Sequence, residues 1–183
     1  RLQVGDRIAL VAPASGFRPA DLDRGIAELR RLGFDAVFDE AILARDRFEA
    51  GPAALRARVL HRAWRDPGVA ALLCVRGGYG SQQLLPLLEP EVMRGARKML
   101  VGYSDITALH AWSFAHGMVS LSGPMVDGRL AVGPAAYDED SFLRALTMPE
   151  PRGPLAPAGV QVLWPGEAGG VVVGATLTQL ESL

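Results

Sequence analysis

The sequence has few of the residues on which many catalytic and structural sites depend. It contains one cysteine, Cys74, and three histidines in 183 residues. A single cysteine excludes an intramolecular disulfide and any metal site built from several cysteines, and its apolar neighbours predict a buried, unreactive thiol. The histidines do not have the spacing of metal ligands among themselves or with carboxylates. We therefore expect no metal site.

A charge surplus and a long apolar run are also missing. The 19 basic and 20 acidic side chains give a formal net charge of −1, which favours neither nucleic acid nor an anionic membrane as a partner. No apolar run approaches the roughly 20 residues that span a bilayer, and the N-terminus has no signal-peptide pattern. We expect a cytoplasmic protein. Because the chain starts at Arg1 and ends within a helical pattern, we interpret it as a fragment.

Short apolar runs alternate with amphipathic stretches, which is typical of a βαβα chain. Such a chain predicts an α/β fold with a doubly wound, mostly parallel sheet and helices on both faces. The predicted strands are Arg7 to Ala12, Ala36 to Asp39, Val69 to Val75, Lys98 to Val101 and Met118 to Leu121. The predicted helices are Asp21 to Leu32, Pro52 to Arg65, Ser81 to Leu88, Ile106 to His116 and Asp138 to Leu146.

The amino-acid composition becomes rich in proline near residue 150. Four prolines in residues 148–157 predict a linker or, alternatively, an edge crossing. We assign residues 1–150 to one α/β domain and residues 151–183 to the linker and the start of a truncated second domain. Val160 to Leu163 and Gly170 to Val173 are predicted as two short strands. Leu84, Leu85, Leu87 and Leu88 exceed one helical stripe, which indicates core burial or, alternatively, a homodimer contact. His61, on a predicted helix, is interpreted as a surface residue.

Three turns that follow predicted strands are unusual, and ligands of open α/β sheets bind beyond the carboxyl ends of strands. The turns are Ala12 to Gly16, Arg76 to Gly80 and Gly102 to Asp105. The glycines of the second turn allow its N–H groups to face a carbonyl, carboxylate or phosphate oxygen. A tight strand-to-helix connection explains them equally well. The dinucleotide and Walker glycine patterns are absent.

Ser104 is the candidate nucleophile. It follows Gly102 by two residues, as in a nucleophile elbow, although Ile106 stands where hydrolases have a second glycine. The alternative is that Ser104 and Asp105 cap the following helix. A nucleophilic serine needs a base, but His110 lies on the same predicted helix and cannot reach back, and His116 is placed for a C-cap role.

Five segments together resemble the LD-carboxypeptidase family of serine peptidases, which includes muropeptide LD-carboxypeptidases and microcin C immunity peptidases. In order along the chain they are Val11 to Ser15, Arg76 to Gly80, Gly102 to Thr107, Gly123 to Met125 and Gly174 to Leu180. The resemblance covers nearly the whole chain. It implies a class I glutamine amidotransferase-like or flavodoxin-like fold for the first domain.

The resemblance also implies roles for individual residues. Ser104 would be the nucleophile, and the backbone N–H groups of Asp105 and Gly78 would form the oxyanion hole. Arg76, Gly77 and Tyr79 would bind substrate, with Arg76 either recognising a carboxylate or forming a structural salt bridge.

The family uses no metal or organic cofactor and hydrolyses the bond to terminal D-alanine in murein tetrapeptides during cell-wall recycling. Its triad glutamate and histidine come from the C-terminal domain, and no histidine follows His116 here. We therefore expect the 183-residue chain to be nearly inactive alone. A microcin-immunity-like peptidase and a non-catalytic peptide-binding module are the alternatives.

Overall fold

The core of the protein is a five-stranded parallel sheet with the strand order β2-β1-β3-β4-β5. The computed structural model describes residues 1–150, 153–154 and 159–183. The strands are β1 (Arg7–Val11), β2 (Asp35–Phe38), β3 (Ala71–Cys74), β4 (Met99–Gly102) and β5 (Ser120–Ser122). Their bounds agree with the sequence predictions to within two residues at each end, and the predicted parallel α/β sheet is confirmed.

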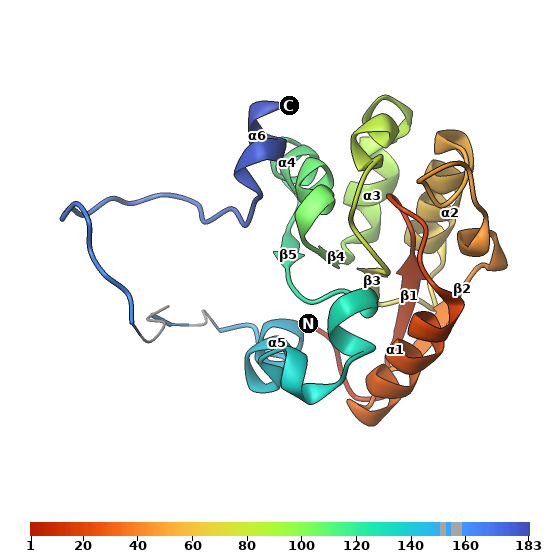
Figure 1. Ribbon diagram of the computed structural model, residues 1–183, viewed down its shortest axis with the longest axis horizontal. Coiled ribbons are helices and arrows are strands. Elements are labelled where there is room, and N and C mark those ends of the chain that lie inside the picture. Colours follow the sequence, from red (N-terminus) through yellow and green to blue (C-terminus); the bar gives the residue numbers. More distant parts are fainter. Residues whose placement is uncertain (151–152, 155–158) are drawn as a thin grey trace.

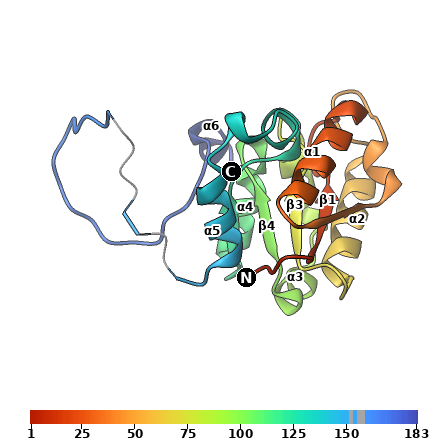
Figure 2. The ribbon, with the colours of Figure 1, turned by 90° about the horizontal axis from the view of Figure 1, so that it is seen from below.

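Helices cover both faces of the sheet, as Figures 1 and 2 show. On one face α1 (Pro19–Arg31) and α5 (Glu139–Thr147) pack on the sheet, and on the other lie α2 (Ala53–Arg65), α3 (Pro90–Ala96) and α4 (Thr107–Ala115). Alternate residues of β1 serve the two layers: Leu10 belongs to the first core cluster and Val11 to the second. Both faces of each central strand are therefore buried, which explains the continuous apolar runs in the sequence.

The helix boundaries follow local signals. Gly33 ends α1 with φ +91°, and its N–H donates to Arg30 O, as expected for a C′ glycine. Asp138 caps α5 by accepting a hydrogen bond from Ser141 N. The helix predicted at Ser81 to Leu88 is present, but it is not an α-helix. It is a 3-10 helix, η2 (Ser81–Leu87), because Pro86 lies inside it and has no N–H for an α-helical bond.

One further prediction is corrected. His61 is buried on α2, and its Nε2 accepts a hydrogen bond from Glu89 N at 3.1 Å, so it is not a surface residue. His61 is covered because α3 and the helical segment before it, residues 81–87, pack against α2. Of the four clustered leucines, Leu84 and Leu88 are buried in the core while Leu87 is 43% exposed. Cys74 is fully buried, and burial raises the pKa of its thiol, as predicted.

The segment after the sheet domain contains no strand among its described residues. The stretches Val160–Leu163 and Gly170–Val173 are irregular and exposed and form no ladder with a described strand. Val171 to Gly174 nevertheless lie against the edge strand β5, where Gly174 packs on the Ser122 side chain. Figure 1 shows this segment running out from the sheet and returning so that α6 (Leu177–Glu181) lies beside α4. Much of the predicted linker, residues 151–152 and 155–158, lies outside the described residues. No helix in the described part is long and apolar enough to cross a membrane.

Candidate active site

The turn between β4 and α4 places Ser104 in a left-handed backbone conformation. Its φ is +62°, one of three positive values among the described non-glycine residues. A serine rarely adopts this conformation, which costs about 1 to 2 kcal/mol. A Cβ at Gly102 would lie 3.0 Å from the Ile106 side chain, so the turn is too tight for a larger residue there. The Ser104 hydroxyl makes no hydrogen bond within the described residues.

The glycine loop after β3 lies directly against this turn. A Cβ at Gly77 would be 3.1 Å from Ser104 Cβ and 3.3 Å from Asp105 N, so only glycine permits the observed approach. Gly78 has φ +98°, and a Cβ there would be 2.5 Å from Ser15 Oγ. Ser15 holds the loop, since its N–H donates to Gly77 O and its Oγ accepts from Tyr79 N. The three unusual turns thus meet at the carboxyl edge of the sheet.

Asp105 does not cap α4. Its carboxylate is buried and accepts hydrogen bonds from Ser81 N at 2.8 Å and from Gln179 Nε2 at 3.1 Å. Neither Ser104 nor Asp105 makes a side-chain capping bond, so the capping alternative is wrong. The backbone N–H groups of Asp105 and Gly78 donate to no other described protein group. They are therefore backbone donors without a partner, one in the serine turn and one in the glycine loop packed against it.

Arg56 is a site-supporting residue that the sequence interpretation missed. Its guanidinium is buried and donates to Pro13 O at 2.6 Å, Gly51 O at 2.8 Å and Gly80 O at 2.8 Å. One side chain thereby joins the turn after β1 to the glycine loop. Burial lowers the pKa of the Arg56 guanidinium. The sequence signal that could have identified Arg56 is its position four residues before Leu60, which places this arginine on the apolar stripe of α2.

The two exposed side chains of the glycine loop differ in their surroundings. Arg76 Nη1 lies 3.4 Å from Asp127 Oδ2 and donates to Gly16 O at 3.3 Å, so the predicted salt-bridge alternative is present in the structure. Tyr79 is 59% exposed and has no ring or side-chain hydrogen-bond partner among the described residues. The glycine loop therefore exposes the cation of Arg76, which already has a carboxylate partner, and the aromatic ring of Tyr79, which has none.

The nearby histidines are occupied in structural contacts. His110 is buried, with Nε2 2.9 Å from Gly102 O and Nδ1 2.8 Å from Ser120 Oγ. Because a carbonyl only accepts, Nε2 carries the proton and Nδ1 accepts from the serine in the neutral ring. His116 lies at the C-cap of α4, with Nδ1 2.7 Å from Trp112 O. Within the described ranges no three His, Cys, Asp or Glu side chains form a group that could hold a metal ion.

Burial of His110 predicts a loss of stability on acidification. Burial lowers the pKa of His110 below its ordinary 6.5. As the pH falls below about 6.5, the unfolded chain takes up a proton that the native state refuses, so the free energy of unfolding decreases by up to about 1.4 kcal/mol per pH unit until the folded-state pKa is passed. Urea unfolding at pH 7.5 and 5.5 measures this decrease. A His110→Gln variant that declines as steeply as the unchanged protein would contradict the assignment.

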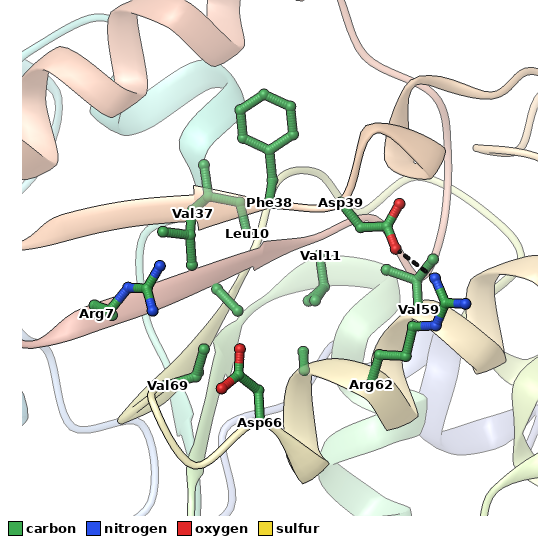
Figure 3. Close-up of a pocket in the computed structure, with 12 residues that line it drawn as sticks. Arg7, Leu10, Val11, Val37, Phe38, Asp39, Val59, Arg62, Asp66 and Val69 are labelled. Carbon is green, nitrogen blue, oxygen red and sulfur yellow. Dashed lines mark hydrogen bonds and ion pairs between the residues drawn. The ribbon is translucent and has the colours of Figure 1, made fainter.

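Two cavities differ in their relation to the serine turn. One of about 350 Å³ lies at the carboxyl ends of β4 and β5 and is lined by Tyr103, Ser122, Gly123, Pro124, Arg129, Ala136 and Tyr137. The other, of about 330 Å³, lies between β1, β2 and α2, with Arg62 and Asp39 paired at 3.0 Å (Figure 3). No residue of the serine turn or glycine loop lines this second cavity.

The C-terminal segment also reaches the serine turn. Thr176 N donates to Thr107 Oγ1 at 2.9 Å, and Gln179 binds the Asp105 carboxylate. The C-terminal segment therefore holds Thr107, in the first turn of α4, and Asp105, which precedes that helix. The whole arrangement is an α/β domain with a serine at a strand-to-helix turn, the position at which α/β hydrolases carry their nucleophile.

The chain belongs to the LD-carboxypeptidase family. The family model described as the LD-carboxypeptidase N-terminal domain matches residues 8–123, which include all five strands except the first residue of β1. This confirms the resemblance drawn from the sequence motifs. The matched range contains the serine turn, the glycine loop and the turn after β1.

Relatives and solved structures agree with this membership. A Streptomyces coelicolor protein provisionally named a carboxypeptidase is 42% identical over 98% of the chain and 59% of its own length. The murein tetrapeptide carboxypeptidase of Pseudomonas aeruginosa is 36% identical over 68% of the chain and 41% of its length. A structure of MccF in complex with glutamyl sulfamoyl guanosine has a TM-score of 0.75 at 26% identity, over 80% of this chain and 45% of that chain. The chain thus spans about half the length of these relatives.

Proposed function

We propose that this chain is the nucleophile-bearing part of a serine LD-carboxypeptidase that releases terminal D-alanine from murein tetrapeptides. The observation that carries the proposal is the left-handed Ser104, whose hydroxyl has no hydrogen-bond partner among the described residues and whose Cβ would lie only 3.1 Å from a Cβ at Gly77. The murein tetrapeptide activity named for the Pseudomonas aeruginosa relative supports the substrate. In keeping with that substrate, we propose a cytoplasmic role in cell-wall recycling.

In the proposed reaction Ser104 Oγ attacks the carbonyl carbon of the L,D-peptide bond. The carbonyl oxygen becomes an oxyanion, which the N–H groups of Asp105 and Gly78 stabilise. The proton of the hydroxyl passes to a base and then to the leaving amine of D-alanine, and water releases the acyl group. Tyr79 and the backbone of Gly77 line the approach to the serine.

The base is the part of this proposal that the described histidines do not supply. Both ring nitrogens of His110 are occupied, and His116 stands at the far end of α4. The family resemblance assigns the base and its orienting carboxylate to a histidine and a glutamate of a C-terminal domain. We therefore propose residues 1–150 as the serine domain and 151–183 as the linker and the start of that second domain, with the 183-residue chain nearly inactive alone.

A substrate panel tests the function in the longer protein that carries the second domain. The expected result is release of D-alanine from a murein tetrapeptide, followed by mass spectrometry, with at least about 100-fold slower hydrolysis of the diastereomer that ends in L-alanine. The 183-residue chain serves as the comparison and is expected to show little turnover. Robust hydrolysis by the short chain would show that the base lies within it.

A second candidate is an immunity peptidase that cleaves aminoacyl nucleotides, because the MccF structure holds glutamyl sulfamoyl guanosine. Adding an aminoacyl sulfamoyl adenosine to the panel separates the two activities. Exclusive turnover of that compound favours the second candidate. Binding of either ligand with no turnover favours a non-catalytic peptide-binding module. A homodimer is a further proposal, based on the 43% exposed Leu87 of η2, and sedimentation of the longer protein tests it.

A further inference from the structure

The cavity at the carboxyl ends of β4 and β5 adjoins the serine turn through Tyr103. Tyr103 lines this cavity and immediately precedes Ser104. Gly123 also lines the cavity and donates its N–H to Gly102 O at 3.1 Å, so the cavity is tied to the end of the strand that leads to the serine. A group bound in this cavity would therefore lie beside the residue that immediately precedes the candidate nucleophile.

Arg129 is the charged side chain that lines this cavity, and it is held in place. Its Cζ lies 6.0 Å from the centroid of the Tyr103 ring, and its Nη1 donates to Ala136 O at 3.2 Å. A cation over an aromatic face is attracted by the ring, which fixes the guanidinium near the serine turn. Tyr137 also lines the cavity and is fixed by its hydroxyl, which donates to Glu28 Oε1.

The charge of Arg129 has no carboxylate partner within 4.0 Å among the described residues. Its neighbour in sequence, Asp127, instead pairs with Arg76. The backbone between them explains the separation, because Asp127 is extended and Gly128 has φ +77°, which interrupts the turn η4 (Val126–Leu130). The arginine that the sequence suggested for carboxylate recognition, Arg76, is therefore partnered, whereas Arg129 is not.

We propose that Arg129 binds the terminal carboxylate of the peptide whose scissile carbonyl lies at Ser104. The planar guanidinium has five N–H donors in a fork that matches a carboxylate, and one donor is used by Ala136 O. The site takes a single residue that ends in a free carboxylate, and it restricts cleavage to the last peptide bond. This inference rests on the proposed peptidase function and adds the residue that makes the enzyme a carboxypeptidase.

The test compares two substrates in the longer protein: the tetrapeptide with a free D-alanine carboxylate and the same peptide ending in D-alaninamide. Arg129→Gln is expected to raise KM for the acid about 10- to 100-fold, with a much smaller change in kcat, and to leave KM for the amide nearly unchanged. Arg129→Lys is expected to recover part of the loss, because it keeps the charge without the fork. Arg144→Gln, an exposed change on α5, is the matched control.

The possible outcomes distinguish a failure of the carboxylate site from a failure of the proposed peptidase function. If the unchanged protein hydrolyses neither peptide, both the peptidase function and the carboxylate site are wrong. If it hydrolyses the acid and Arg129→Gln keeps the same ratio of KM for acid and amide, only the carboxylate site is wrong. An equal loss for both peptides likewise contradicts carboxylate recognition, since a structural role of Arg129 affects both. Thermal unfolding of each variant confirms that it is folded.

Discussion

Ser104→Ala is expected to lower kcat/KM of the longer protein for its peptide by about 10⁴- to 10⁶-fold. Removing the nucleophile of a serine peptidase leaves only what the oxyanion donors and substrate binding contribute. The hydroxyl makes no hydrogen bond within the described residues, so its removal leaves no polar group unpaired. Activity should therefore fall with almost no change in the free energy of unfolding. Steady-state hydrolysis and urea unfolding of the same preparation measure both.

The combination of the two measurements makes this prediction specific. Loss of activity together with a large loss of stability would indicate a structural role for the hydroxyl. A variant that keeps more than about 1% of the activity would place the nucleophile elsewhere. An active-site serine reagent that labels the unchanged protein but not Ser104→Ala provides an independent check of the attacking atom.

Arg56→Ala is expected to produce the largest loss of stability, about 3 kcal/mol in the free energy of unfolding. The change removes hydrogen bonds to three backbone carbonyls, those of Pro13, Gly51 and Gly80, in a buried setting. Each buried carbonyl left without a donor costs about 1 to 3 kcal/mol, and water entering the space recovers part of that. The glycine loop is one of the three segments released, so activity should fall as well.

The matched control is Arg58→Ala, an exposed arginine two residues along the same helix. It is expected to change stability by less than about 0.5 kcal/mol. Arg56→Lys should fall between the two, since an ammonium can bind some but not all of the three carbonyls. Equal unfolding free energies for the Arg56→Ala and Arg58→Ala variants would show that the carbonyl contacts contribute little.

The layout of the sheet and the turns at its carboxyl edge could be predicted because their signals are local. The apolar run at Leu72 and Leu73 is buried on both faces, and Gly33 stops α1 at the predicted position. The close approach of the serine turn and the glycine loop followed from parallel topology, which brings all carboxyl ends to one edge. The motif Gly102 to Asp105 therefore predicted that the candidate nucleophile is a serine and also that it lies at the carboxyl edge of the sheet.

What could not be predicted depends on contacts between residues far apart in the sequence. Arg56 binds a carbonyl 43 positions away, and no local pattern identifies that partner. The pairing of Arg76 with Asp127 depends on the unusual backbone at Gly128, whose glycine allows several conformations. Sequence periodicity predicted a helix at Ser81 to Leu88 but not its 3-10 type, because the proline that changes the type of helix does not disturb the apolar spacing.

The left-handed backbone of Ser104 bears on how this family could diverge. Glycine or asparagine would occupy φ +62° with less strain than serine, so the fold by itself favours a residue without the hydroxymethyl group. A lineage released from selection for hydrolysis would gain stability by drifting to one of those residues at this position. A family member with the same strand order but glycine at position 104 is thus expected to bind peptides without hydrolysing them.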